Sequence, residues 1–172
     1  METAMEDQHV TGCNRLASDW ILWAHFPHDT DWSVGSYKMV AEMNTAEGVI
    51  AIAETLPDTL VKNCMLFLMR EGIQPIWEDP SNRDGGCFSY KVQNKDVPST
   101  WKNLMYAVTG ESVTYDRALL ESVNGITLSP KKNFCIIKIW LKNCHHQNPR
   151  QINDTIGLSW KGCIFKKQTP EY

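Results

Sequence analysis

Residues 123–141 read VNGITLSPKKNFCIIKIWL, which is two β-rich runs joined by a polar connector. The runs are Val123–Ser129 and Phe134–Leu141, and both contain the β-branched and aromatic residues that favour strands. The connector, Pro130-Lys131-Lys132-Asn133, has the length of a hairpin loop. The segment therefore predicts an antiparallel strand pair and a fold built on a β-sheet.

Further strands and helices are expected on either side of this hairpin. A helix is predicted over Pro98–Val108, where apolar residues recur at helical spacing until Gly110. A second helix is expected from Thr45 to Glu54, with Asn44 or Thr45 as its N-cap. The other expected elements are strands over Asp19–Phe26, Val34–Val40, Met65–Met69, Phe88–Gln93 and Leu158–Phe165, a helical turn after Leu56, and a short helix over Pro149–Gly157. This mixture indicates an α+β fold.

Length and composition fit a single globular domain. The chain has 172 residues, with 17 Lys and Arg against 20 Asp and Glu and a net charge of −3. We expect residues 1–15 to be a flexible N-terminal segment and residues 16–172 to form one domain. No apolar run of about 18 residues and no targeting pattern occurs in the sequence, so a cytoplasmic protein is predicted. The six cysteines are irregularly spaced and are expected to be reduced.

The sequence contains no recognised catalytic or metal-binding motif. The five histidines fit no catalytic pattern, and neither a G-x-S-x-G element nor paired carboxylates occur. Cys144-His145-His146 lacks the further ligands at defined spacing that zinc requires. Gly85-Gly86 matches no phosphate-binding loop and is interpreted as a turn. The sequence therefore predicts a protein that is not an enzyme and that has no metal or cofactor.

Two tryptophans lie in polar loops, where core residues are not expected. Trp32 follows Asp29-Thr30-Asp31, and Trp77 lies in the sequence PIWEDP at residues 75–80. Two such rings can hold a planar base between them, and a cation–π attraction strengthens the stacking if the base is positively charged. Glu78 can then accept two parallel hydrogen bonds from the N1–H and N2–H₂ edge of guanine, which adenine lacks.

The same residues also have plainer interpretations. A single Trp is more often a packing residue than a ligand-binding one, and two adjacent lysines in a hairpin are usually only solvated. If the loop tryptophans do bind a nucleotide, Lys131 and Lys132 are placed to contact its phosphates. Composition alone leaves these alternatives open.

The motifs in their order along the chain resemble those of a known family. They are GIQPIWED at residues 72–79, Gly85-Gly86, the stretch from Trp101 to Gly110-Glu111-Ser112, the pair Trp20 and Trp23, Trp32, and IKIW at residues 137–140. This combination is similar to the eukaryotic translation initiation factor 4E family, whose members bind the 5′ cap of mRNA. The similarity extends from Leu16 to Phe165.

The resemblance implies a fold and a base-binding site. The expected fold is a curved antiparallel sheet of about eight strands, with about three helices on its convex face and the cap slot on its concave face. Trp32 and Trp77 would sandwich 7-methylguanine, Glu78 would bind its N1 and N2 edge, and the Trp77 backbone N–H would meet O6. Trp140 would lie against the N7-methyl group, which makes the base cationic. Trp23 and Trp101 match structural tryptophans of the family.

The resemblance also implies phosphate contacts. The expected cap-phosphate residues are Lys131, Lys132 and Lys161. The chain departs from the family where Asn133, Ile136 and Cys87 replace residues that are usually basic. We therefore expect the triphosphate contacts to be weaker or differently arranged than in other members.

Partner docking is expected on the convex face. The family displays a Trp there that packs against helices of scaffold and repressor proteins, and the matching stretch here is AEGVI at residues 46–50. Ile50 stands at the position of that Trp. The docking residues implied by the resemblance are Leu16, Val49 and Ile50, and the replacement predicts a divergent member with altered partner binding.

The sequence thus predicts a protein that binds the 7-methylguanosine cap to promote or regulate translation initiation. Two alternatives stay open at this stage. One is an enzyme that acts on capped or guanine nucleotides, and the other is a repressor that sequesters capped mRNA without recruiting a scaffold. An interaction module with a decayed pocket is disfavoured because Trp32, Trp77, Glu78 and Trp140 are all retained.

Overall fold

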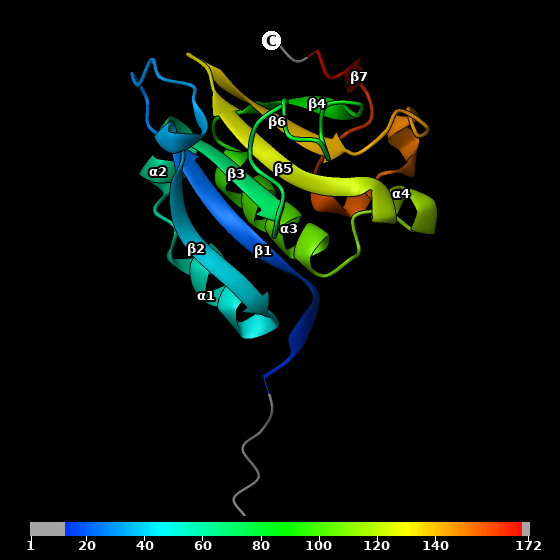
Figure 1. Cartoon of the computed structure of the whole chain (residues 1–172), viewed down its shortest axis with the longest axis horizontal. Coiled ribbons are helices and arrows are strands. Elements are labelled where there is room, and N and C mark those ends of the chain that lie inside the picture. Colours follow the sequence, from blue (N-terminus) through cyan, green and yellow to red (C-terminus); the bar gives the residue numbers. More distant parts are fainter. Residues whose placement is uncertain (1–12, 170–172) are drawn as a thin grey trace, which may run out of the picture.

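The computed structural model describes residues 13–169, and these form one curved antiparallel sheet with helices packed on it (Figure 1). The strands are β1 (Arg15–His25), β2 (Lys38–Thr45), β3 (Met65–Arg70), β4 (Gly86–Gln93), β5 (Val123–Pro130), β6 (Phe134–Leu141) and β7 (Ile164–Lys167). The seven-stranded sheet has the order β2-β1-β3-β5-β6-β4-β7 and is open, with β2 and β7 at its edges. The predicted hairpin of β5 and β6 is therefore central to the sheet.

Four α-helices occur among the described residues: α1 (Ala46–Thr55), α2 (Asp58–Asn63), α3 (Val97–Thr109) and α4 (Arg117–Ser122). Thr45 caps α1, because its side chain accepts a hydrogen bond from the Gly48 N–H at 3.1 Å. α3 is the longest helix, and it contacts α1, α2, β1 and β5. Gly110 follows its last residue, as the sequence pattern predicts.

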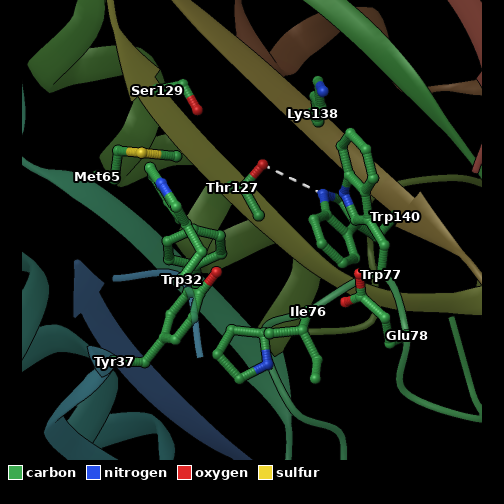
Figure 2. Close-up of a pocket in the computed structure, with 12 residues that line it drawn as sticks. Trp32, Tyr37, Met65, Ile76, Trp77, Glu78, Thr127, Ser129, Lys138 and Trp140 are labelled. Atoms are coloured by element: carbon green, nitrogen blue, oxygen red, sulfur yellow. Dashed lines mark hydrogen bonds between the residues drawn. The ribbon is translucent and has the colours of Figure 1, made fainter. Parts of the chain in front are cut away.

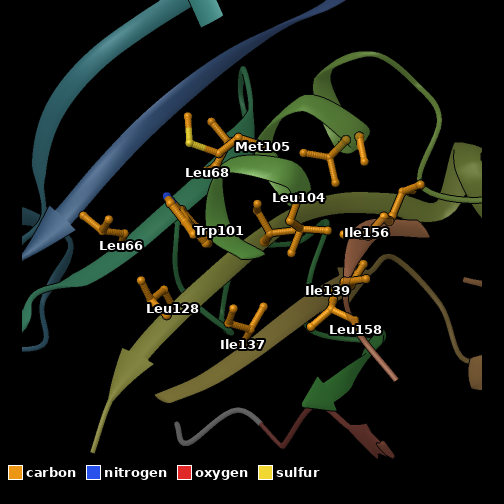
Figure 3. Close-up of a cluster of buried hydrophobic side chains, with 14 of the residues drawn as sticks. Leu66, Leu68, Trp101, Leu104, Met105, Leu128, Ile137, Ile139, Ile156 and Leu158 are labelled. Atoms are coloured by element: carbon orange, nitrogen blue, oxygen red, sulfur yellow. The ribbon is translucent and has the colours of Figure 1, made fainter. Parts of the chain in front are cut away.

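Side chains alternate between the two faces of the sheet. On β3, Leu66 and Leu68 point toward the helices and are fully buried, whereas Met65 and Phe67 lie on the opposite face. The core on the helix side centres on Trp101 of α3, which lies among leucines and isoleucines of the central strands (Figure 3). The opposite face carries the site described below, over β3, β5 and β6, and among residues 13–169 no helix residue lines that site.

The α+β class and the antiparallel sheet are confirmed. The sheet has seven strands rather than about eight, residues 13–169 contain four α-helices rather than about three, and several boundaries differ from the expectation. The predicted strand over Val34–Val40 begins as a 3₁₀ turn at Val34–Ser36, because Ser36 hydrogen bonds back to the Ser33 carbonyl through both its N–H and its hydroxyl. Its β-structure starts only at Lys38.

The C-terminal elements are also shorter than predicted. Two 3₁₀ turns, Pro149–Gln151 and Asp154–Ile156, replace the expected short helix, because Ile152 between them forms a β-bridge with Thr114. The last strand starts at Ile164 rather than at residue 158. The six-residue helix α4, which Asp116 caps, was not predicted from the sequence.

The ends of the chain bear on the expected domain boundary. Residues 1–12 of the predicted flexible segment lie outside the described part. Within it, Asn14 donates to the Glu47 carboxylate at 2.8 Å and Arg15 already belongs to β1, so structural contacts begin before Leu16. All six cysteines carry free thiols. None of the helices in residues 13–169 has the length and apolar character needed to cross a membrane.

Candidate functional site

A cavity of about 340 Å³ opens on the sheet face opposite the helices. Its floor comes from β3, β5 and β6, and two loops form its walls (Figure 2). One loop follows β1 and carries Trp32, and the other follows β3 and carries Trp77 and Glu78. The lining residues are Trp32, Tyr37, Met65, Phe67, Pro75, Ile76, Trp77, Glu78, Thr127, Ser129, Lys138 and Trp140.

Trp32 is held in place from behind by His25, the last residue of β1. The two rings stack with their centroids 3.9 Å apart and their planes at 1°. His25 is buried, and its Nε2 lies 2.8 Å from the Asp31 carbonyl oxygen. Because His25 covers one face of the indole and Trp32 is still 54% exposed, the other face is available to the cavity.

The turn before Trp32 is also fixed by its own side chains. Asp29 accepts a hydrogen bond from the Asp31 N–H at 2.9 Å, and Asp31 accepts one from the Ser33 N–H at 2.8 Å. Hydrogen bonds from Ser33 lower the pKa of the Asp31 carboxyl, which stays ionised as a turn former. The Asp-rich sequence thus positions the indole through local Asx turns.

The loop that carries Trp77 is held by a buried polar network. Asn82 is fully buried and donates from Nδ2 to the Gln74 and Ile76 carbonyls at 3.1 and 2.9 Å. Asn124 of β5 donates to Asn82 Oδ1 at 2.9 Å and so anchors the loop to the sheet.

Asp79, also buried, closes the same loop. Its carboxylate accepts from the Gln74 N–H at 2.9 Å and from the Ser81 N–H at 2.8 Å. These bonds hold the backbone on both sides of Trp77, whose side chain remains 37% exposed. Trp77 and Glu78 are therefore exposed residues on a rigid loop rather than core residues.

The floor of the cavity combines aromatic rings with polar groups. Trp140 of β6 is buried, and its Nε1–H donates to Thr127 Oγ1 on β5 at 3.1 Å (Figure 2). Phe67 and Met65 of β3 extend this floor toward Trp32. With Trp32 and Trp77 on opposite sides, the cavity offers aromatic surface to a flat ligand from three directions.

Glu78 and Lys138 are the charged residues that line the cavity. The Lys138 ammonium lies 5.5 Å from the centroid of the Trp77 ring, within cation–π distance. Burial and the Glu78 carboxylate raise the pKa of Tyr37 to about 12, so this phenol is neutral at physiological pH and can donate a hydrogen bond. The site therefore has a carboxylate acceptor, the hydroxyls of Tyr37, Thr127 and Ser129, and one cation around an aromatic slot.

The structure brings together all four residues expected to bind the base, Trp32, Trp77, Glu78 and Trp140. It does not place the three expected phosphate lysines in the same cavity. Lys131 and Lys132 are exposed on the turn between β5 and β6, and Lys161 lines a separate cavity of about 670 Å³ beside β4 and α3. Lys138 takes the cationic position in the pocket instead.

Three residues at the site were not predicted from the sequence: His25, Tyr37 and Lys138. A signal for Lys138 was present, because it lies two residues before Trp140 on a strand and therefore faces the same side. No comparable signal existed for His25 and Tyr37, whose rings reach the site through tertiary packing; they contact each other edge-on with centroids 5.1 Å apart.

The expected docking residues lie at the N-terminal end of β1 and on α1. Ile50 is 51% exposed, Val49 is buried in the core, and Leu16 is partly buried against it. Ile50 therefore provides the accessible apolar surface of this group.

In residues 13–169 no three His, Cys, Asp or Glu side chains are grouped to hold a metal ion, and His146 instead lies 4.0 Å from the Asp116 carboxylate.

The sequence matches the model of the family described as "Eukaryotic initiation factor 4E" over residues 15–171, almost its whole length. The chain belongs to the eukaryotic initiation factor 4E family. It is 32% identical over 182 residues to eukaryotic translation initiation factor 4E-2 of Schizosaccharomyces pombe, covering 99% of this chain and 69% of that protein. It is 42% identical over 136 residues to the initiation factor 4E homolog of Acanthamoeba polyphaga mimivirus, covering 67% of this chain and 50% of the viral protein.

Solved structures of family members share the fold. A crystal structure of Ascaris suum eIF4E-3 with m7G cap matches with a TM-score of 0.69 at 22% identity, over 85% of this chain and 79% of that one. A complex of C. elegans eIF4E-3 with the 4E-binding protein Mextli matches with a TM-score of 0.68 at 20% identity, over 77% and 78%. Membership in this family of translation initiation factors confirms that the chain is not an enzyme.

Proposed function

We propose that this protein binds the 7-methylguanosine cap of mRNA in the cavity between Trp32 and Trp77 and acts in translation initiation in the cytoplasm. The observation that carries the proposal is that Trp32, Trp77 and Glu78, from two separate loops, line one cavity whose floor is Trp140. The m7G cap in the Ascaris suum eIF4E-3 structure supports the same ligand class.

Each residue would contribute a distinct part of the recognition. Stacking between the indoles of Trp32 and Trp77 supplies affinity, and the positive charge of a methylated guanine adds a cation–π attraction. Glu78 accepts from N1–H and N2–H₂, so the carboxylate selects guanine over adenine. Trp140 packs against the N7-methyl group from the floor of the cavity.

Lys131, Lys132 and Lys161 are proposed to contact the cap phosphates. All three lie on exposed turns outside the strands, so their long side chains can extend toward the phosphates. In a chain with a net charge of −3, such contacts act locally and are sensitive to salt.

The proposal is tested by titrating 7-methyl-GTP into three single variants: Trp32→Ala, Trp77→Ala and Glu78→Gln. Each tryptophan variant is expected to lose about 1–3 kcal/mol of binding free energy, because the base loses one stacking partner. Glu78→Gln is expected to reduce the preference for guanine over adenine nucleotides. The matched control is Trp160→Ala, since Trp160 is also partly exposed but stacks under Arg150 outside the cavity. Unchanged affinity in all three site variants would refute the proposal.

Partner docking is proposed at α1. Ile50 presents a smaller apolar surface than the tryptophan that the family resemblance places there, so a helical 4E-binding segment is expected to bind weakly. This favours a member that regulates capped mRNA with altered scaffold recruitment. Titration of a 4E-binding peptide into the protein and into Ile50→Trp tests the idea, and equal affinities for the two would contradict it.

A further inference from the structure

Three lysines lie on the same face of the sheet as the cavity, on neighbouring strands β6, β4 and β7. Ser89 of β4 pairs with Lys138 on β6 and with Ile164 on β7. Residues paired across antiparallel strands share a face, as do residues two apart on one strand. Lys138, Lys91 and Lys166 therefore all face the side that carries the cavity, and we call them the lysine strip.

The charge of the lysine strip is not neutralised within the described structure. β4, β6 and β7 contain no Asp or Glu, and no carboxylate of residues 13–169 lies within ion-pair distance of Lys138, Lys91 or Lys166. Burial raises the pKa of the Cys87 thiol on this face, and both Lys138 and Lys166 act against that rise, which places both ammonium groups near it. A chain with more acidic than basic residues thus gathers unpaired positive charge here.

Aromatic and apolar side chains lie beside the lysine strip. The Lys91 ammonium is 4.2 Å from the centroid of the half-buried Phe134 ring, and Ile164 is 57% exposed. Cations next to a stackable ring are typical of proteins that bind single-stranded nucleic acid. Lys138 belongs both to the lysine strip and to the lining of the cavity, so the two sites are continuous.

We propose that the lysine strip binds the phosphates of the RNA chain that follows the cap. The RNA would leave the cavity and cross β6 and β4 to reach β7. The inference rests on the proposed cap site and extends it to nucleotides beyond the cap. Neighbouring strands are about 4.8 Å apart, so the distance from β6 to β7 is about 10 Å and the first nucleotides suffice to reach the edge strand. Continuity with the cavity favours RNA over an acidic protein segment as the ligand.

The test compares 7-methyl-GTP with a capped oligonucleotide of about five nucleotides, a length at the low end of single-strand site sizes. Both are titrated at several salt concentrations into the unsubstituted protein and into a Lys91→Gln/Lys166→Gln double variant. A Lys62→Gln/Lys102→Gln double variant is the control, because it removes the same charge from α2 and α3 on the other face.

The unsubstituted protein is expected to bind the capped oligonucleotide more tightly than 7-methyl-GTP. In the Lys91→Gln/Lys166→Gln variant, the salt dependence for the oligonucleotide is expected to weaken by about 1.4 in log–log slope, about 0.7 per lost phosphate contact, with 7-methyl-GTP unaffected. An unchanged slope, with normal 7-methyl-GTP binding, would overturn the lysine strip proposal alone. Absence of 7-methyl-GTP binding by the unsubstituted protein would instead overturn the cap site and the strip with it.

Discussion

Replacing Asn82 with alanine tests whether the buried polar network holds the loop that carries Trp77. The side chain donates two hydrogen bonds to loop carbonyls and accepts one from Asn124, all fully or partly shielded from water. A buried hydrogen bond contributes about 1 kcal/mol, and partners left unsatisfied add to the loss. Three bonds therefore predict a loss of about 3 kcal/mol in the free energy of unfolding for Asn82→Ala.

Urea unfolding followed by tryptophan fluorescence measures this loss. The midpoint is expected to fall while the slope of the transition is unchanged, because the surface exposed on unfolding is nearly the same. Affinity for 7-methyl-GTP is also expected to fall in the folded variant, since the Ile76 carbonyl beside Trp77 loses its donor. The control is Asn103→Ala on the exposed face of α3.

A loss below about 1 kcal/mol, or one equal to that of Asn103→Ala, would show that the Asn82 network does not hold the loop. It would mean that the Gln74 and Ile76 carbonyls find other donors and that the loop does not depend on Asn82. A large loss of stability with unchanged 7-methyl-GTP affinity would show that the network stabilises the fold without positioning Trp77.

Two further predictions concern a titration and a close backbone approach. The pKa of Tyr37 is expected to be about 12 rather than about 10, and to be lower in Glu78→Gln. Because the folded protein keeps the phenol proton up to a higher pH than the unfolded chain does, the free energy of unfolding relative to Tyr37→Phe should decrease between pH 10 and pH 12. Ionisation of Tyr37 near pH 10 in both the unsubstituted protein and Glu78→Gln would contradict this. Gly85→Ala is expected to lose at least about 3 kcal/mol in unfolding experiments, because its Cβ would overlap the Leu141 carbonyl oxygen; Gly35→Ala, with no atom near the added methyl, is the control, and equal stabilities would disprove the overlap.

Local sequence predicted the elements whose signals are local. The apolar spacing of α3, the N-cap at Thr45 and the hairpin of β5 and β6 all depend on residues close in sequence, and the structure confirms them. The turns at Val34–Ser36 and after residue 149 were missed because a serine back-bond and a distant β-bridge decide them. Strand propensity alone does not show that such hydrogen bonds or bridges compete with the predicted strand or helix.

The candidate site divides in the same way. Trp32, Trp77 and Glu78 stood out because exposed aromatic and acidic residues in short loops have no packing role, and the family resemblance then placed them together. The residues that hold them in place did not stand out. No local pattern indicates that His25 stacks on Trp32, and Asn82 and Asn124 are far apart in the sequence. Lys138 could have been found from strand alternation alone, because it lies two residues from Trp140.

Tryptophan fluorescence of the unsubstituted protein, titrated with 7-methyl-GTP and separately with GTP, tests cap recognition most directly. Stacking against Trp32 and Trp77 should quench emission, and loss of the methyl group removes the positive charge that the indole faces attract. We predict saturable quenching by 7-methyl-GTP, with GTP binding about tenfold more weakly or worse. Equal quenching by the two nucleotides, or none by either, would contradict specific recognition of the methylated cap between Trp32 and Trp77.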